Sequence, residues 1–189
     1  MSKKTWIIVG VFAFVILVPL FIAYSAYNRL VVLNESVDSS WAQVENVLQR
    51  RYDLIPNLVN TVKGYAKHEK ELLEEVTRLR SQWGAAKTTD AKIQASGQLE
   101  GALGRLMVVM ENYPNLKANE GFLKLQDELS GTENRIAVER MRFNEVVRAY
   151  NIATRGFPSN IIAGMFNFQK SDAYFKANEA AKEAPKVSF

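Results

Sequence analysis

The sequence contains no cysteine and a single histidine, His68, among its 189 residues. Without cysteine, disulfides, thiolate metal sites and cysteine nucleophiles are all excluded. A dinuclear carboxylate centre in a helical bundle normally uses two Glu-x-x-His pairs, and the residue three before His68 is Tyr65. We therefore expect no metal site and no cofactor, and we place His68 on a solvent-facing helix position.

The usual residues of nucleophilic catalysis are also scarce. One histidine and no cysteine leave only Ser–Lys pairs. The serines considered for such a pair all lack a lysine at a convincing helical spacing: Ser81, Ser96, Ser130 and Ser159. Gly-rich phosphate loops are absent, and a carboxylate pair would need an open cleft that a narrow bundle does not offer. We predict that the protein is not an enzyme, and an unrecognised carboxylate site is the enzymatic hypothesis that remains.

Charge of one sign is not concentrated anywhere in the chain. The formal net charge is +4, and the 24 basic residues include Lys3 and Lys4, so 22 basic and 20 acidic residues follow them. Between residues 69 and 80 the signs alternate, which is typical of a solvated helix face. No basic stripe is present, so we expect no nucleic-acid partner.

The longest uncharged stretch of the chain contains the apolar segment from Trp6 to Ala26. As a helix its 21 residues are about 31 Å long, which matches the roughly 30 Å hydrocarbon core of a bilayer. The predicted anchor has interfacial aromatic residues at its ends and apolar residues between, represented by Trp6, Phe12, Leu17 and Tyr24. The competing hypothesis is a signal peptide cleaved after Ala23-Tyr24-Ser25, although the apolar run exceeds the usual 7–15 residues of such a peptide.

The charges beside this stretch bear on orientation. Lys3 and Lys4 precede it and Arg29 follows it, so the positive-inside rule favours a cytoplasmic N-terminus and an extracytoplasmic domain. We expect a single-pass protein of the cell (inner) membrane whose first partner is the lipid bilayer.

Apolar residues recur at spacings of three and four through most of the remaining chain, which predicts helices. The pattern predicts helical segments over residues 28–83, with a bend or break at Pro56, over 90–112 and 119–154, and a short apolar helix over 161–166. The predicted fold is all-α: a transmembrane helix followed by an elongated antiparallel bundle of three to four helices. The expected division is an anchor over 1–27, a bundle over 28–168 and a C-terminal tail over 169–189.

Several short motifs resemble the LemA family, in family order and over nearly the whole chain. They are Tyr27-Asn28-Arg29-Leu30-Val31, Trp41-Ala42-Gln43-Val44, Gln49-Arg50-Arg51-Tyr52-Asp53-Leu54-Ile55-Pro56-Asn57-Leu58-Val59, Val62-Lys63-Gly64-Tyr65-Ala66, Tyr113-Pro114-Asn115-Leu116-Lys117-Ala118-Asn119-Glu120, Gly131-Thr132-Glu133-Asn134-Arg135-Ile136-Ala137, Arg148-Ala149-Tyr150-Asn151 and Phe157-Pro158-Ser159-Asn160. The resemblance implies a membrane-anchored antiparallel bundle of about four helices and little about activity. It also implies the opposite orientation, with the short N-terminus outside, so the two orientations stay open.

Two clusters of residues are candidates for a site. The first is a polar network across the bundle seam, formed by Arg51, Tyr52, Asp53, Glu133, Asn134 and Arg135. We interpret it as fixing helix register, with an anionic ligand or lipid headgroup bound by Arg51 and Arg135 as the alternative. The second is an apolar interaction patch made of Phe157, Ile161, Ile162 and Phe166. It either closes one end of the bundle or docks onto the membrane or another subunit.

Three functions remain in order of preference. The first is an anchored structural or scaffold protein that associates with itself or with other membrane proteins. The second is a regulatory adaptor or sensor that binds an anionic ligand through the arginine-containing seam. The third is the enzyme with a carboxylate site.

Overall fold

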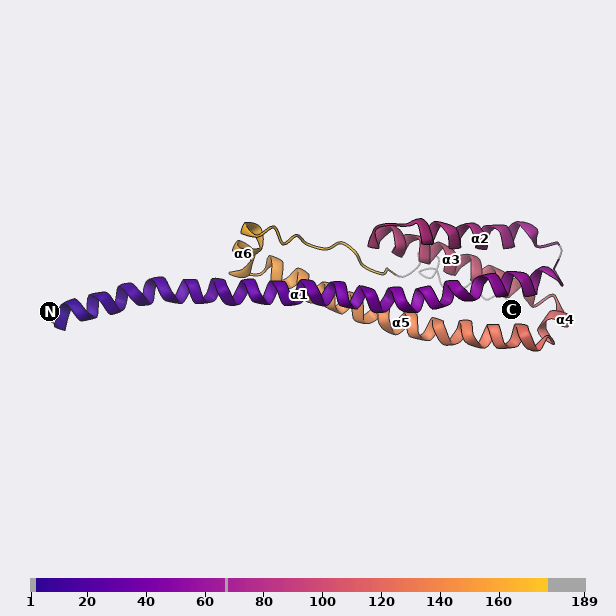
Figure 1. Cartoon of the computed structure of the whole chain (residues 1–189), viewed down its shortest axis with the longest axis horizontal. Helices are drawn as coiled ribbons and strands as arrows, with labels where there is room; N and C mark the ends of the chain where they lie inside the picture. Colours follow the sequence, from indigo (N-terminus) through magenta and orange to yellow (C-terminus); the bar gives the residue numbers. More distant parts are fainter. Residues whose placement is uncertain (1–2, 67, 177–189) are drawn as a thin grey trace, which may run out of the picture. The chain divides into compact units, whose positions relative to one another are not determined.

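The computed structural model describes residues 3–66 and 68–176. Its elements are α1 (Lys3–Lys63), α2 (Lys70–Ala85), α3 (Thr89–Met110), α4 (Pro114–Lys117), α5 (Glu120–Arg155) and α6 (Ser159–Met165), shown in Figure 1. No strand occurs in the described part of the chain, and residues 171–176 have no regular structure. The predicted all-α fold is confirmed. Residues 177–189 of the predicted tail lie outside the described residues.

Helix α1 continues through Pro56, where the sequence pattern predicts a bend or break, and ends instead at Lys63. A proline at position 56 has no N–H to donate to the carbonyl of Tyr52, four residues earlier. Arg80 of α2 supplies the missing donor, because its Nε lies 3.0 Å from the Tyr52 carbonyl oxygen. The predicted helix over 28–83 is therefore wrong in its division, and the chain reverses between Lys63 and Lys70.

The described residues fall into two compact units. The first unit contains residues 3–39 and 145–172, and the second contains residues 40–66, 68–144 and 173–176. Helices α1 and α5 each contribute one part to each unit.

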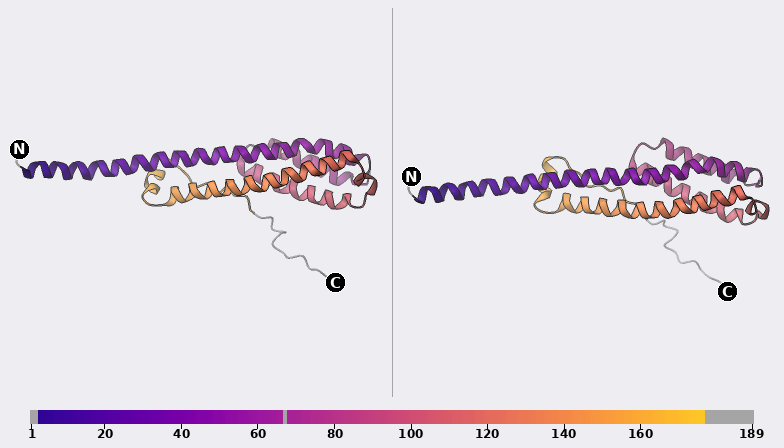
Figure 2. Two further views of the ribbon diagram at one scale, coloured as in Figure 1. Left: turned by 90° about the horizontal axis from the view of Figure 1, so that it is seen from below. Right: turned by 60° about the horizontal axis from the view of Figure 1, so that its bottom comes forward.

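The second unit is an antiparallel bundle of α1, α2, α3 and α5, with α4 in the connection between α3 and α5. Helices α2 and α3 lie side by side, and the second-unit parts of α1 and α5 run alongside each other in both views of Figure 2. The Asn119 side chain caps α5 as its sequence position predicts, since its Oδ1 accepts from the Phe122 N–H at 3.0 Å. Large side chains that are almost fully buried form the core: Leu48, Ile55, Leu58, Leu99, Leu106, Met110, Leu116, Ile136 and Phe143.

The first unit has a smaller core, formed where α1, α5 and α6 meet. Leu30, Ala153 and Ala163 are buried there, with Leu33, Ile162 and Phe168 packed against them. Helix α6 ends in a turn at Asn167, whose φ of 59° is left-handed. The Phe168 N–H donates to the Ala163 carbonyl at 2.9 Å, which is the long bond of a Schellman motif. This turn places Phe168 back against the core.

The N-terminal part of α1 has no covering in the structure. It contains an 18-residue window of mean hydropathy 2.9, none of which is buried. Trp6, Phe12, Leu17 and Tyr24 are 65%, 68%, 62% and 69% exposed. Leaving so many large apolar side chains in water is unfavourable, at about 25 cal/mol for each Å². The length and composition of this helix suit a membrane span.

Candidate functional site

Arg51 and Glu133 form an ion pair between α1 and α5 in the second unit. The Arg51 Nη1 lies 2.5 Å from the Glu133 Oε2, and the side chains are 9% and 40% exposed. Apolar residues recur at spacings of three and four in both segments, which favours an amphipathic helix in each. Arg51 lies at the edge of the inward face of α1, and Glu133 lies at the edge of the inward face of α5. Burial makes this pair costly to break, because the arginine would keep its charge without a partner.

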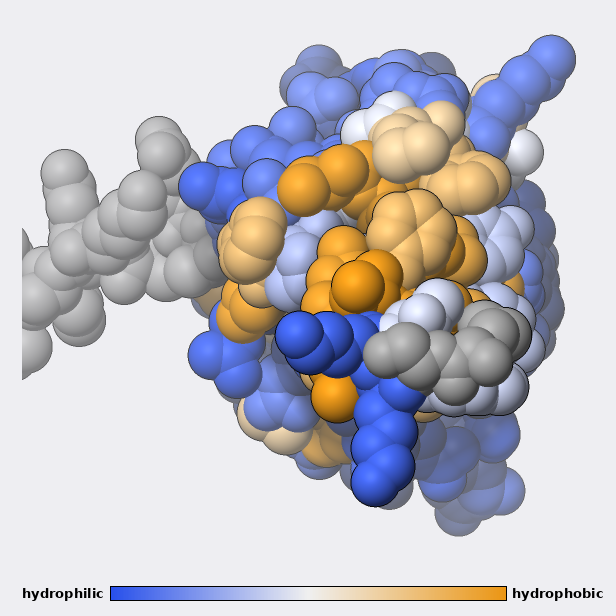
Figure 3. Space-filling view, turned by 90° about the vertical axis from the view of Figure 1, so that its left-hand side faces the viewer, coloured by the Kyte–Doolittle hydropathy of each residue, from blue (hydrophilic) through white to orange (hydrophobic). Residues whose placement is uncertain are grey.

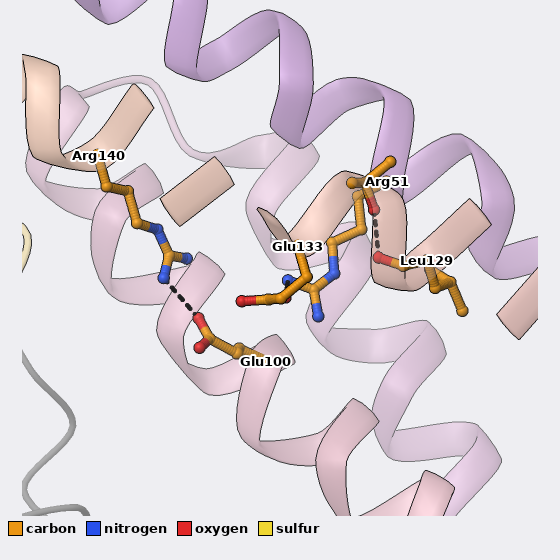
Figure 4. A network of polar contacts seen from close by, with 6 residues as sticks. Arg51, Glu100, Leu129, Glu133 and Arg140 are labelled. Atoms are coloured by element: carbon orange, nitrogen blue, oxygen red, sulfur yellow. Dashed lines mark hydrogen bonds and ion pairs between the residues drawn. The ribbon is translucent and has the colours of Figure 1, made fainter. Parts of the chain in front are cut away.

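A second pair joins α5 to α3. The Arg140 Nη1 lies 2.7 Å from the Glu100 Oε2, with side chains 19% and 39% exposed, and the Arg140 guanidinium carbon lies 5.0 Å from the centre of the Phe175 ring. Figure 4 shows Arg140 extended toward Glu100, and Arg51 and Glu133 turned toward each other. We call Arg51, Glu100, Glu133 and Arg140 the Arg–Glu seam. The two pairs of the seam therefore connect α5 to both α1 and α3.

Tyr52 is buried beside the seam. Its ring centre lies 4.0 Å from that of Trp83, and its hydroxyl finds no hydrogen-bond partner among the described residues. Burial raises the pKa of the Tyr52 hydroxyl well above its ordinary value, and the positive charges of Arg51 and Arg140 lower it only in part. Tyr52 therefore stays protonated in the folded protein and serves as a packing residue.

The structure does not bring together all six residues of the predicted polar network. Asp53 is exposed and accepts a hydrogen bond from Gln49, one turn earlier on the same helix, at 2.8 Å. Asn134 and Arg135 are also exposed. The reason is rotation about the helix axis, because each residue advances by about 100°. A helix that turns Arg51 or Glu133 inward therefore carries its second neighbour to the opposite side.

Sequence reasoning missed Glu100 and Arg140 in this seam. A signal for Arg140 was present, since it follows Glu133 by seven residues, or two helical turns, and so shares its face. Glu100 gave no local signal, because its partner lies 40 residues away in sequence.

Two surface grooves adjoin the seam. One of about 390 Å³ lies beside Arg51, Glu133 and Asn134. A larger one of about 880 Å³ is lined mainly by residues of α2 and α3, together with Arg140 and Phe175. Three of the arginines on the grooves already have a carboxylate partner, because Arg105 pairs with Glu75 at 2.7 Å in addition to the two seam pairs.

The predicted apolar patch is divided by the structure. Ile162 packs against the core of the first unit, whereas Phe157, Ile161 and Phe166 are 84%, 54% and 55% exposed. Met165, which sequence reasoning did not include, is 72% exposed and follows Ile161 by four residues on the same face of α6. The segment therefore packs inward with one side and presents apolar side chains on the other.

Two asparagines of α5 bind the extended segment that follows α6, and sequence reasoning missed both. In the first unit the Asn151 amide donates to the Ser171 carbonyl at 2.7 Å and accepts from the Ser171 N–H at 2.9 Å. In the second unit Asn144 makes the same pair of bonds to Phe175, at 2.8 and 2.9 Å. The Phe175 ring then lies against Trp41 and Phe143, with centres 6.2 and 5.9 Å away.

Ligands for a metal ion are not clustered in the described residues. No group of three or more histidine, aspartate and glutamate side chains is placed to hold a metal there. His68 is exposed.

Comparison with known proteins settles the family. The model of the LemA family matches residues 40–189, which is more than half of the chain. The chain belongs to the LemA family. The resemblance carried by the Arg51–Asp53 and Glu133–Arg135 motifs is confirmed.

Several LemA-related proteins are similar to this one. Magnetosome protein MamQ 2 of Paramagnetospirillum magneticum is 27% identical over 180 aligned residues, which cover 82% of this chain and 66% of the relative. Magnetosome protein MamQ of Magnetospirillum gryphiswaldense is 28% identical over the same shares. Protein LemA of Metamycoplasma hominis is 25% identical over 170 residues, covering 88% of this chain and 74% of the relative. This LemA-family chain thus spans just under two thirds of the length of the MamQ relatives.

Proposed function

We propose that this LemA-family protein is a membrane-anchored, non-enzymatic scaffold that associates with itself or with other membrane proteins. The observation that carries the proposal is the uncovered apolar part of α1, whose 18-residue window of mean hydropathy 2.9 has no buried residue. A bilayer covers such a segment and holds the attached bundle at high local concentration near other membrane proteins. The relatives described above are named magnetosome protein or LemA, and neither name denotes a reaction.

The Arg–Glu seam supports a structural role for the bundle. Each of its two arginines is paired with a glutamate of another helix, at 2.5 and 2.7 Å. An anionic ligand would have to displace a carboxylate that is already in place. This argues against the adaptor or sensor hypothesis, in which the seam binds an anionic ligand or a lipid headgroup.

Light scattering of the detergent-solubilised full chain tests self-association. We expect a protein mass above that of one copy, or an equilibrium that shifts toward larger species as concentration rises. The scaffold proposal would be contradicted if the protein is a strict monomer at every concentration and if no other membrane protein is recovered with it after native purification. Thermal unfolding with added inorganic phosphate or phosphatidylglycerol tests the alternative, since a concentration-dependent rise in Tm that the Arg51→Met variant lacks would favour a ligand-binding seam.

The same chain allows a test of orientation. It contains no native cysteine, so a single Val108→Cys substitution on the exposed surface of α3 creates a unique thiol. We propose an extracytoplasmic bundle, for which a membrane-impermeant maleimide labels this thiol in intact spheroplasts. Labelling only after lysis would place the bundle in the cytoplasm.

A further inference from the structure

Helix α6 and its flanking phenylalanines carry an apolar surface that nothing covers in the first unit. The exposed fractions of Phe157, Ile161, Met165 and Phe166 are 84%, 54%, 72% and 55%. We call these four residues the α6 face. Residues 156–169 contain no charged side chain at all. Figure 3 views the molecule from the end at which α1 begins, so the apolar side chains gathered at its centre include those of the uncovered N-terminal part of α1.

The α6 face is held in place rather than loosely attached. Ala163 is 3% exposed and Ile162 packs beside it on the core formed with Leu30 and Ala153. The Ser159 hydroxyl donates to the Ala153 carbonyl at 2.6 Å, which ties the start of α6 to the last turns of α5. With one side of the helix fixed in this way, the opposite side is a permanent apolar surface.

The position of the α6 face along α1 identifies what covers it. The Phe166 and Phe168 rings lie 4.7 and 5.9 Å from the ring of Tyr27, the residue that directly follows the proposed membrane span over residues 6–26. Leu30, where α6 meets α1, is four residues beyond Ala26, or about 6 Å along the helix axis. The headgroup layer on each side of a bilayer is roughly 5–8 Å deep. If residues 6–26 fill the hydrocarbon core, α6 therefore lies at the depth of the headgroups.

The charged residues that border residues 156–169 in sequence, Arg155 and Lys170, are both basic. Arg155 is the last residue of α5 and directly precedes residues 156–169, and Arg29 lies two residues after Tyr27. Both arginines are exposed. Exposed arginines at this depth are attracted to lipid phosphates. An apolar face with basic residues at its border is the pattern of a helix that lies in the membrane surface.

We propose that α6, with Phe157 and Phe166, inserts into the boundary between headgroups and acyl chains of the leaflet in which the α1 span ends. The protein then has two membrane contacts: one helix that crosses the bilayer and one that lies in its plane. The inference rests on the proposed anchoring of α1. It commits to lipid as the occupant of the α6 face, because this surface is continuous with the segment that the bilayer covers.

Spin-label accessibility in the full chain tests the inference. Met165→Cys gives a unique thiol at an exposed position, and a nitroxide attached there is measured in vesicles of phosphatidylethanolamine and phosphatidylglycerol. Oxygen concentrates in the bilayer and a neutral nickel chelate stays in water, so their relative collision rates report depth. Val108→Cys is the matched control, because Val108 is 71% exposed and Met165 72%. Ile16→Cys reports the span.

We expect the label at position 165 to favour oxygen over the nickel chelate, between the values at positions 16 and 108. A label at 165 that matches position 108 overturns the inference. So does a label shielded from both reagents, because that result means a protein partner or a second copy covers the α6 face. Failure of the anchor itself is separate, since it appears as nickel access at position 16. A Phe157→Cys label repeats the test at a second site.

Discussion

Replacing Arg80 by methionine removes the donor that compensates for Pro56. In the protein the Arg80 Nε donates to the Tyr52 carbonyl at 3.0 Å, at the position where an ordinary helix residue would donate its own N–H. A hydrogen bond from a charged donor contributes about 1.5–3 kcal/mol, and a carbonyl left without a donor costs a similar amount. Arg80 is only partly buried, so water replaces some of the bond. We expect Arg80→Met to lower the free energy of unfolding by about 1–2 kcal/mol.

A second substitution makes this expectation specific. Pro56→Ala restores a backbone N–H at the right place for the Tyr52 carbonyl. In that background Arg80→Met should cost about 0.5 kcal/mol or less, so the two positions are coupled by roughly 1 kcal/mol. Arg78→Met, on the exposed side of the same helix, is the matched control and should change little in either background.

Thermal unfolding of the full chain in one detergent, followed by far-ultraviolet circular dichroism, compares these variants with the wild type. For a chain of this size each kcal/mol shifts Tm by about 2–4 °C. Arg80→Met alone should therefore lower Tm by about 2–8 °C, and much less beside Pro56→Ala. Equal losses in the two backgrounds would show that the Arg80 bond does not compensate for the proline, and would refute the reasoning.

Three other predictions have definite outcomes. Glu133→Ala leaves the buried Arg51 guanidinium without its carboxylate and should cost about 1–3 kcal/mol in urea unfolding, while Arg51→Met with Glu133→Leu should recover most of that loss; no recovery would mean that the pair does more than satisfy the arginine. Because burial raises the pKa of Tyr52, the unfolded chain loses this proton near pH 10 and the folded chain does not, so wild-type stability should fall as pH rises past about 10, and Tyr52→Phe should escape that part of the fall. A Tm difference between the two proteins that is constant with pH would contradict this. Asn167→Gly should leave Tm unchanged and Asn167→Val should cost about 1–2 kcal/mol, since only the valine is strained at a φ of 59°; equal Tm values would argue against the left-handed turn.

The local sequence pattern was sufficient to predict that the chain is helical, but it was insufficient to predict where one helix ends and the next begins. The spacing of apolar residues predicts an all-helical chain because each helix buries one face. It misplaces the break after residue 28, because the Arg80 side chain that lets α1 continue past Pro56 comes from 24 residues further on. Local rules contain no term for such a donor.

The candidate site was predictable only in part for a related reason. The polar residues in the Arg51 and Glu133 motifs mark a seam between α1 and α5, and these two residues do meet. Which neighbouring residues also face the seam depends on the rotation of each helix about its own axis, and a difference of one residue changes the answer. The packing of the three helices sets this rotation. It turns Asp53 and Arg135 away from the seam, and it turns Arg140, two turns after Glu133, toward the seam.

We propose that the apolar part of α1 remains in the mature protein as a membrane anchor. Intact mass spectrometry of the protein extracted from carbonate-washed membranes tests it most directly. The full chain should be recovered from the membrane fraction at a mass near 21.4 kDa. A membrane-free protein with the mass of a chain that begins at Ala26 would show that the apolar segment is removed, and would contradict the proposed anchor.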